Sequence, residues 1–409
     1  MEDLKSRGHL LSYHSALDSK LQLHKFGDYL YDNIVYFAPE AEYFAKISFS
    51  DLTEFIDQGG NLLVGASGKA SAGLRNFAES CGVEFDSEGS AVIDHFNVVP
   101  ELDKTLQHTA LLSSASVLNT AVLPTFSSLS GDKKKVAYSG IGHAVEDGNI
   151  LAVKTLQGNP STYSANPATP IKDFPESAGA DVLLVSAIQG RNNVRTVFSG
   201  SIDMFSNEYF ALSDASNREF CADISAWAFG ENGVLRFRDV RHHKKDGTPP
   251  DVILHEKKRP DLPVSLFPDP EITRNSLVYR IKDEITYSLV VEELRGGEWA
   301  PFHTDDMQVE FVMLDAHVLK TMTADRKTGR FSVTFTAPDN YGIFKFRVLY
   351  RRQGLSVLHS EEAVSLRPYK HDEYDRFLFT AYPYYTSAFS AVAGFAVFSI
   401  FFLFSSDKK

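Results

Sequence analysis

Short motifs that bind phosphate or expose a nucleophile are incomplete in this chain. A phosphate-binding loop requires Gly, four residues and then Gly-Lys-Ser/Thr, but Gly68-Lys69 is followed by Ala70, and Leu63 stands where the first glycine belongs. No Gly-x-Ser-x-Gly turn is present, so a serine hydrolase would lack the strained turn that exposes its serine. No Asp-x-Asp occurs, which removes the carboxylate pair by which many glycosyltransferases hold a divalent metal. The sequence therefore predicts no catalytic residue, no metal site and no cofactor.

Two residue pairs, Asp94-His95 and His242-His243, have side chains that can act as acid, base or metal ligand. Adjacent residues on a strand point to opposite faces, and His242-His243 lies in a Lys- and Pro-rich stretch that is typical of a solvated loop. The sequence therefore favours structural roles for both pairs. The glycines of residues 65–73 follow a predicted strand, so a ligand site at that edge of a sheet stays an alternative to a plain turn.

The composition indicates an acidic protein of several domains. The chain has 409 residues, of which 43% are hydrophobic, and a formal net charge of -12. Single cores usually stop growing at roughly 250–300 residues, so two or three domains are expected. The acidic charge argues against a nucleic-acid partner, because phosphate binding requires clustered Lys and Arg. Cys81 and Cys221 form no CxxC pair, and the sequence leaves open whether they make a disulfide.

Residues 1–213 alternate strand-like and helix-like segments, which predicts an α/β domain with a mainly parallel, doubly wound sheet of the flavodoxin-like kind. The short apolar runs 34–38 and 61–66 are typical of strands that are covered on both faces. Later strands are expected at 181–187 and 194–198. The residues before them are rich in Ser, Pro, Gly and Asn, which predicts short strands and long loops.

Residues 214–275 are expected to connect this domain to a second one, because residues 241–275 are rich in proline and charge. Residues 276–368 then contain repeated runs of β-forming residues separated by turn residues, which predicts an all-β domain of the β-sandwich type. The pattern of residues 331–350 favours a hairpin whose turn contains Pro338, Asp339, Asn340 and Gly342.

A transmembrane helix is predicted at residues 386–404, after a juxtamembrane segment at 369–385. No charged residue occurs between 377 and 406, and the apolar stretch is long enough to cross a hydrocarbon core of roughly 30 Å. The lysines of the tail, residues 405–409, mark the cytoplasmic side, so the bulk of the chain is expected to be exoplasmic or lumenal.

Two sets of side chains are the candidate functional residues of this helix. Tyrosine rings favour the headgroup layer, so the predicted interface anchors are Tyr382, Tyr384 and Tyr385. A strip of small side chains lets another helix approach closely, although such residues are also common in single spans. The candidate helix-packing strip consists of Ser387, Ser390, Ala391 and Gly394.

Several longer stretches carry a resemblance to a known family. In chain order they are KFGDYLYDNIVYFAP (25–39), FIDQGGNLLVGAS (55–67), CGVEFD (81–86), AVIDHFN (91–97), GRNNVRTVFSGSIDMFSNEYF (190–210), GEWAPFHTDDMQVEFVMLD (297–315), PDNYGIFKFRVLYRRQG (338–354) and RFLFTAYPYYTSAFSAVAGFAVFSI (376–400). Over nearly the whole chain these stretches resemble the 48 kDa subunit family of the dolichyl-diphosphooligosaccharide–protein glycosyltransferase, the oligosaccharyltransferase.

The resemblance implies a non-catalytic, structural and stabilising subunit of the oligosaccharyltransferase complex. That enzyme transfers a preassembled oligosaccharide from dolichyl diphosphate to Asn of Asn-x-Ser/Thr in nascent polypeptides. The resemblance also implies a single-pass type I protein of the endoplasmic reticulum membrane, with its bulk in the lumen. Its implied partners are a many-span catalytic subunit, the other subunits of the complex and the lipid bilayer. No catalytic residue is carried over from the family.

One departure from the family pattern qualifies this interpretation. Family members normally begin with a signal peptide and a first strand of the α/β domain, whereas residues 1–15 contain no apolar run of that kind, so the first strand is expected to be missing.

Two other functions stay open. One is a membrane-anchored receptor that binds carbohydrate or peptide at the glycine-bearing turns, and the other is a membrane-tethered hydrolase of flavodoxin-like fold.

Overall fold

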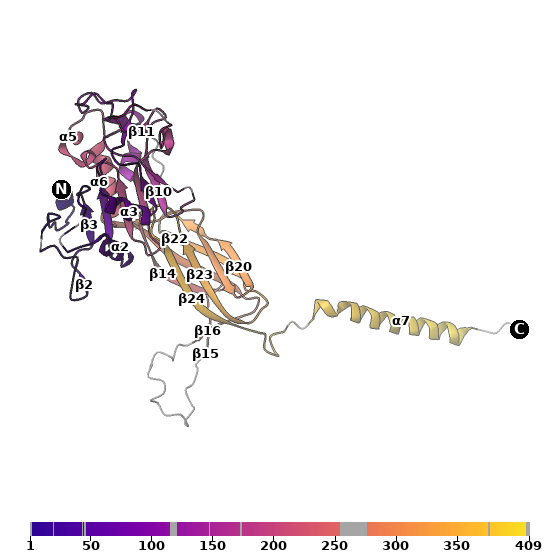
Figure 1. Ribbon diagram of the computed structural model, residues 1–409. Helices are drawn as coiled ribbons and strands as arrows, with labels where there is room; N and C mark the ends of the chain where they lie inside the picture. Colours follow the sequence, from indigo (N-terminus) through magenta and orange to yellow (C-terminus); the bar gives the residue numbers. More distant parts are fainter. Residues whose placement is uncertain are drawn as a thin grey trace.

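The computed structural model describes residues 2–405 apart from residues 19, 43, 45, 115–120, 147, 172–173, 254–275 and 375–376. An α/β domain and a β-rich domain lie end to end, and helix α7 (Tyr382–Phe404) extends from the far end of the β-rich domain (Figure 1). This arrangement confirms the predicted combination of an α/β region, a β-rich region and one C-terminal apolar helix.

The α/β domain is built on a seven-stranded sheet with the order β3-β4-β13-β12-β9-β5, in which β10 also pairs with β12. In that order the strands are β3 (Asn33–Tyr36), β4 (Asn61–Gly65), β13 (Arg195–Ser199), β12 (Leu183–Gln189), β9 (His143–Val145) and β5 (Val83–Phe85), with β10 (Ala152–Gln157) beside them. β3, β4 and β13 are parallel, whereas the other described pairings in this sheet are antiparallel.

The prediction of a mainly parallel sheet is therefore wrong. Strands β12 and β13 are joined by only residues 190–194 and pair as a hairpin, with Gln189 opposite Arg195. A parallel pair would need a crossover of a dozen or more residues. Apolar runs indicate that a strand is buried, but they do not encode its direction.

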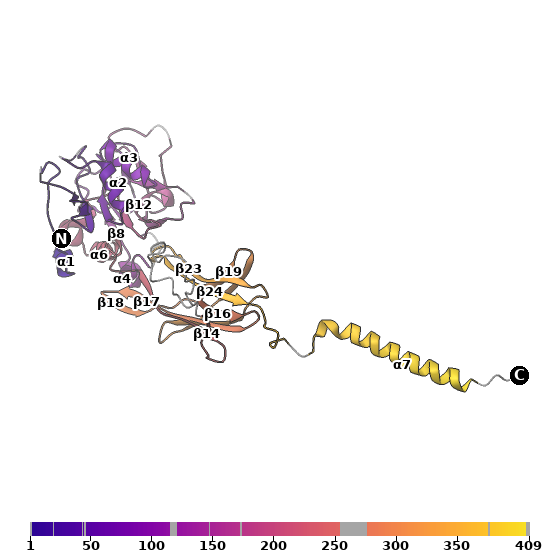
Figure 2. The same cartoon turned by 90° about the horizontal axis from the view of Figure 1, so that it is seen from below.

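Helices cover both faces of this sheet. Leu62 and Val64 of β4 pack with α2 (Phe49–Asp57) and α3 (Ala72–Ser80), whereas Leu63 between them belongs to the core under α6 (Asn217–Ala228). This follows from the alternation of side chains along a strand. Figure 2 shows α2 and α3 on one side of β12 and α6 on the other.

The remaining elements of this domain are short. They are the helices α1 (Glu2–Ser6), α4 (Pro124–Ser128) and α5 (Asn207–Phe210) and the strand pairs β1–β2 (His24–Lys25, Asp28–Tyr29), β6–β11 (Ala91–Ile93, Tyr163–Ala165) and β7–β8 (Leu111–Ser113, Val136–Tyr138).

The β-rich domain consists of two sheets whose inner faces share one core. The five-stranded sheet contains β14 (Val234–Lys244), β17 (Glu284–Arg295), β18 (Glu298–Pro301), β21 (Thr323–Asp325) and β22 (Arg330–Thr336). The six-stranded sheet contains β15 (Asp251–Ile253), β16 (Ser276–Arg280), β19 (Gln308–Met313), β20 (Ala316–Thr321), β23 (Gly342–Tyr350) and β24 (Leu358–Arg367).

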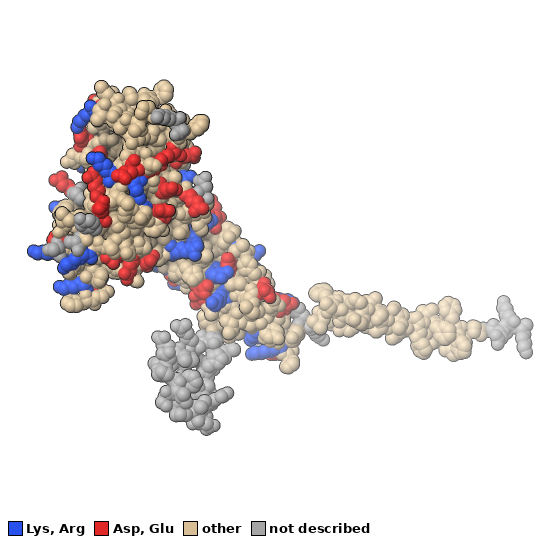
Figure 3. Space-filling model, viewed as in Figure 1, with Lys and Arg blue, Asp and Glu red and all other residues tan. Residues whose placement is uncertain are grey.

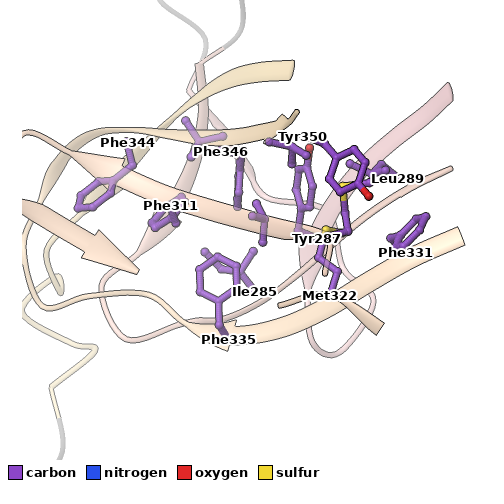
Figure 4. Packing of buried hydrophobic residues seen from close by; sticks show 14 of the residues in the cluster. Ile285, Tyr287, Leu289, Phe311, Met322, Phe331, Phe335, Phe344, Phe346 and Tyr350 are labelled. Atoms are coloured by element: carbon purple, nitrogen blue, oxygen red, sulfur yellow. The ribbon is translucent and has the colours of Figure 1, made fainter. Parts of the chain in front are cut away.

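Aromatic rings from both sheets fill this core. The ring of Phe311 in the six-stranded sheet lies 5.4 Å from that of Phe335 in the five-stranded sheet, and the rings of Tyr287 and Phe346 stack across the sheets at 5.0 Å (Figure 4). Aromatic pairs at such separations stabilise a core beyond the effect of their buried area.

The predicted hairpin at residues 331–350 is wrong, although both of its strands are present. β22 pairs with β17 and β21, whereas β23 pairs with β19 and β24 in the other sheet. Residues 337–341 therefore carry the chain from one sheet to the other. Both strands alternate apolar and polar residues because both face the shared core, and this pattern does not specify the partner strand.

The expected connection, residues 214–275, contains regular structure in its described part: α6, the eleven-residue strand β14, and β15. Residues 254–275 lie outside the described residues. The domain limits drawn from the sequence stay a prediction.

The two domains meet at residues 351–357, the loop between β23 and β24. Indole Nε1 of Trp227 donates to the carbonyl of Gly354 at 2.8 Å, and Nε2 of Gln189 donates to that of Leu355 at 2.7 Å. The backbone N–H of Val357 donates to Oδ1 of Asn193 at 2.7 Å. Because an α6 residue, a β12 residue and a turn residue all bind the same loop, the domains are held in one orientation.

Arg195 of β13 fixes the segment that makes this contact. Its buried guanidinium donates to the carbonyls of Trp227, Asn232 and Gly233 at 2.5–2.8 Å and lies 4.8 Å from the indole ring of Trp227. Burial lowers the pKa of Arg195 to about 10, so it stays protonated at neutral pH. Hydrogen bonds from a charged donor are worth about 1.5–3 kcal/mol each. Without Arg195, the carbonyls of Trp227 and Gly233 would each keep one backbone donor, the N–H of Gly230 and that of Ser356.

We expect Arg195→Met to lower the thermal unfolding midpoint of the detergent-solubilised chain by at least about 5 °C, because three carbonyls each lose a charged donor. The exposed Arg191, four residues earlier, provides the matched control, and Arg191→Met should change the midpoint by less than about 2 °C. Equal shifts in the two variants would contradict this role of Arg195.

Candidate functional site

A cleft of about 660 Å³ opens where the three parallel strands end. The carboxyl ends of parallel strands gather their loops at one edge of a sheet, which is where ligands bind in open α/β folds. The loops after β3, β4 and β13 line one side with Pro39, Glu40, Ser67, Gly68, Ile202 and Asp203. The other side is lined by Ser90, Thr105, Gln107, Thr109 and Ser139 from loops that are distant in sequence.

Of the three glycines in residues 65–73, only Gly68 lines the cleft. Gly68 lies at the wall, where a Cβ atom would approach the carbonyl of Ser90 to 3.0 Å. Gly65 packs under Phe37, and Gly73 packs against Phe49. These two glycines therefore serve core packing.

The electrostatic character of the cleft is polar and acidic. Glu40 and Asp203 supply carboxylates, and burial together with the nearby Glu208 raises the pKa of Asp203. None of the described lining residues is Lys, Arg or His. Such a lining does not suit phosphate, which requires cations or backbone N–H groups aimed at it. Hydroxyl and amide groups suit an uncharged polar ligand.

Asp94 is buried at the centre of a hydrogen-bond network rather than exposed in the cleft. Its carboxylate accepts from Nδ2 of Asn97 and of Asn159, from Oγ of Ser161 and from the backbone N–H of Phe96, at 2.9–3.1 Å. Burial acts to raise the pKa of Asp94, but these donors outweigh it and lower the pKa to about 2. The carboxylate therefore ties its own loop, residues 94–97, to residues 159–161.

His95, beside Asp94, points to the surface. Its Nε2 lies 2.9 Å from the hydroxyl of Tyr163, and its ring lies 4.7 Å from that of His108. No sequence pattern indicated His108, which is 13 positions away in a loop where it adopts a φ of 57°. The described surroundings contain no nucleophile or carboxylate aligned with these rings, so the cluster has no evident catalytic geometry.

The prediction that His242-His243 lies in a solvated loop is wrong, because both residues belong to β14. The side chain of His242 is 4% exposed, its Nδ1 lies 2.6 Å from the hydroxyl of Tyr279, and its ring stacks on Phe346. Nε2 contacts a carboxylate oxygen of Glu362 at 3.3 Å. His242 is therefore a core residue with polar partners.

Other reactive groups are inert. Cys81 and Cys221 are free thiols, and burial raises the pKa of Cys81 to about 11 and that of Cys221 further. His143 is buried against Ser186, and burial lowers its pKa to about 3. Among the described residues, no three His, Cys, Asp or Glu side chains converge as a metal site.

Helix α7 contains the candidate residues of the membrane segment. Residues 379–404 are helical and apolar over a length that can cross a membrane, and Figure 3 shows no charged side chain on α7. Tyr382, Tyr384 and Tyr385 occupy its first turn and are exposed.

The small side chains of α7 lie along one strip. Ser387, Ser390, Ala391 and Gly394 are spaced three and four residues apart on this helix. The Ser387 and Ser390 hydroxyls donate to carbonyls three residues earlier, at 2.8 and 2.9 Å. The polar groups are thus satisfied within the helix, which leaves a smooth, narrow face.

The lowered pKa of Asp94 predicts a pH dependence of stability. Because the folded-state pKa of about 2 lies below the unfolded value of 3.8, the carboxylate stabilises the fold above about pH 4, and this contribution is lost as the pH falls from about 4 to 2. We expect Asp94→Asn to lower the thermal midpoint at pH 7 and to flatten its decline between pH 4 and 2.

The control for this prediction is Glu101→Gln at an exposed carboxylate of the same domain, which should leave the profile unchanged. A profile of Asp94→Asn that runs parallel to that of the unchanged chain would refute the assignment.

Comparisons with known proteins agree over the full length. The family model described as OST48, N-terminal domain, matches residues 1–231, and the OST48 middle domain matches residues 269–406. The dolichyl-diphosphooligosaccharide–protein glycosyltransferase 48 kDa subunit of Drosophila melanogaster is 38% identical over 421 residues, which cover 100% of this chain and 88% of the relative. The proteins of the same name from Danio rerio and Arabidopsis thaliana are 37% and 36% identical and cover 99% and 98% of this chain and 88% of each relative. The chain therefore belongs to the oligosaccharyltransferase 48 kDa subunit family.

Proposed function

We propose that this chain is a non-catalytic subunit of the oligosaccharyltransferase complex, which transfers a preassembled oligosaccharide from dolichyl diphosphate to Asn of Asn-x-Ser/Thr in protein N-glycosylation. The observation that carries this proposal is the likeness to subunits of that enzyme over the entire chain. Its role is to hold and stabilise the other subunits, including the many-span catalytic subunit.

The geometry of the described residues supports an accessory role. The titratable groups with large pKa shifts, such as Asp94, His143 and Arg195, are buried and bonded to neighbours within the fold. A general acid or base must instead reach the proton that it transfers. These groups maintain the structure, and the chemistry of the complex is assigned to another subunit.

We propose further that the chain is a single-pass type I protein of the endoplasmic reticulum membrane, with both folded domains in the lumen. The three tyrosines in the first turn of α7 suit one headgroup layer, and Lys408 and Lys409 follow the helix in the sequence. The tyrosines would anchor the lumenal end of α7, and the two lysines are the cationic residues usual on the cytoplasmic side.

The strip of small residues on α7 is proposed to bind a transmembrane helix of a partner subunit. Without a hydrophobic driving force between helices in lipid, close backbone approach at small residues supplies the attraction. α7 makes few contacts with the rest of the described chain, so its faces are available to partners.

A substitution on this strip should weaken assembly. We expect Ala391→Leu to reduce recovery of the other subunits in a mild-detergent pull-down about tenfold, which corresponds to about 1.4 kcal/mol of helix packing. Ala396, about 140° around the helix, offers the same substitution on the opposite face as the control. If Ala396→Leu reduced recovery as strongly, or if neither variant did, the strip would not be the contact.

A second candidate function, a lumenal receptor for carbohydrate or peptide, is favoured by the cleft at the edge of the α/β sheet. The cleft has the size of a ligand pocket and a lining suited to uncharged polar groups. Saturable binding of a mannose-containing oligosaccharide or an Asn-x-Thr peptide by the purified full chain would favour it over a purely structural role.

We also propose that the first domain is related to the flavodoxin-like fold. Parallel β3, β4 and β13, covered by helices on both faces, support a flavodoxin-like ancestry for that half of the sheet. The expected absence of a first strand stays a prediction.

A further inference from the structure

Three exposed apolar side chains gather at the end of the β-sandwich that faces away from the α/β domain. Leu314 in the β19–β20 turn is 94% exposed, and Tyr341 and Ile343 at the start of β23 are 69% and 68% exposed. The two segments touch, because a side chain at Gly342 would meet Sδ of Met313. Single exposed leucines are ordinary, but a cluster of large apolar groups usually contacts a partner or a membrane.

The backbone at Leu314 adds a second observation. Its φ is 44°, a left-handed conformation that Gly or Asn adopts readily and that leucine adopts at a cost. In the described chain this leucine gains little burial in return, since it is almost fully exposed. A strained, solvent-facing leucine is consistent with an apolar surface outside the chain.

The membrane anchor leaves from this same end. Gly342 pairs with Leu366, and the next residue, Arg367, ends β24. NH1 and NH2 of Arg367 bind the carboxylate of Glu373 at 2.5 and 2.7 Å, which fixes the chain beyond β24 to the sandwich. The end of β24 therefore lies beside the start of β23, where the apolar cluster begins. Figure 1 shows α7 beyond this end of the β-rich domain.

Chain length limits how far this end can lie from the bilayer. Tyr382, the first of the proposed interface tyrosines, follows Glu373 by nine residues, and nine residues span at most about 32 Å. The exposed Phe377 and Phe379 lie between them and add apolar aromatic area to this segment. The sandwich end therefore stays within about 32 Å of the headgroup layer while Glu373 stays bound to Arg367.

We propose that Leu314, Tyr341 and Ile343 insert into the headgroup layer of the membrane that α7 crosses, so that the β-sandwich stands on the lipid surface. This inference rests on the proposed anchoring by α7. Aromatic and aliphatic side chains bind that layer through the apolar area that they bury there. The inserted cluster would add a second point of attachment to the one that α7 provides.

Charge at this end favours apolar insertion over attraction to anionic lipids. Lys282 pairs with Asp339 at 3.1 Å, Lys245 pairs with Glu284, and Lys244 pairs with Asp251. The cations are thus neutralised by neighbouring carboxylates within the protein. The cluster should therefore insert into vesicles without net charge, such as those of phosphatidylcholine.

The test is the depth of a nitroxide label on the full chain reconstituted in phosphatidylcholine vesicles. Leu314→Cys and, separately, Ile343→Cys carry the label. Every variant also carries Cys81→Ser, because Cys81 is only partly buried, whereas Cys221 is buried and stays unlabelled. Val392→Cys in α7 reports the bilayer interior, and Leu106→Cys on the α/β domain, at a residue that is 83% exposed, reports water. Collision rates with oxygen and with a water-soluble nickel chelate are compared.

We expect the oxygen-to-nickel ratio at 314 and 343 to exceed that at 106 by at least about threefold, as for groups about 5–10 Å into the interface. If 392 is in lipid while 314 and 343 match 106, the inference is overturned and the anchoring stands. If 392 also matches 106, the anchoring itself fails. Labels at 314 and 343 that are shielded from both reagents would indicate a protein contact and would likewise overturn the inference.

Discussion

The buried guanidinium of Arg195 is the interaction on which the arrangement of the folded domains depends. It joins a central strand of the α/β sheet to three carbonyls in the segment that leaves α6 and enters β14. That segment presents Trp227 and Gly233, which bind Gly354 and Ser356 of the sandwich. Burying a charge is costly unless its hydrogen bonds are made, and here the carbonyls make them. One side chain thus links the core of the first domain to the contact with the second.

The β-sandwich is held at both of its ends. Loop 351–357 holds one end of the β-sandwich to the α/β domain, and the Arg367–Glu373 pair holds the start of the membrane connection to the other end. The strands β23 and β24 run between these two points. The contact with the α/β domain and the start of the membrane connection therefore lie at opposite ends of the same two strands.

The sequence predicted elements better than their pairing. The apolar runs 34–38 and 61–66 correspond to β3 and β4, because burial on both faces leaves a clear trace in composition. The direction of β12 and the partner of β23 were missed, since burial and alternation are the same for either choice.

For the candidate sites too, local sequence patterns did not show which distant residues come together. His242 was misjudged because Lys and Pro residues follow it, whereas its partners Tyr279 and Phe346 lie 37 and 104 positions away. Gly68 of the glycine-bearing turn lies in one wall of the cleft, but Ser90, Gln107 and Ser139 reach the cleft from separate loops that no local sequence pattern connects. The membrane helix was accessible from sequence because its signal is local and composed of one continuous stretch.

The most direct test of the accessory role compares the chain alone with the chain in its native assembly. The tagged protein is recovered from microsomes in mild detergent, and the eluate is assayed for oligosaccharide transfer to an Asn-x-Thr peptide, before and after a salt and detergent wash that strips bound proteins. Our account predicts transfer activity in the first eluate and none in the stripped chain. A lone protein without activity in the first eluate, or activity retained by the stripped chain, would contradict it.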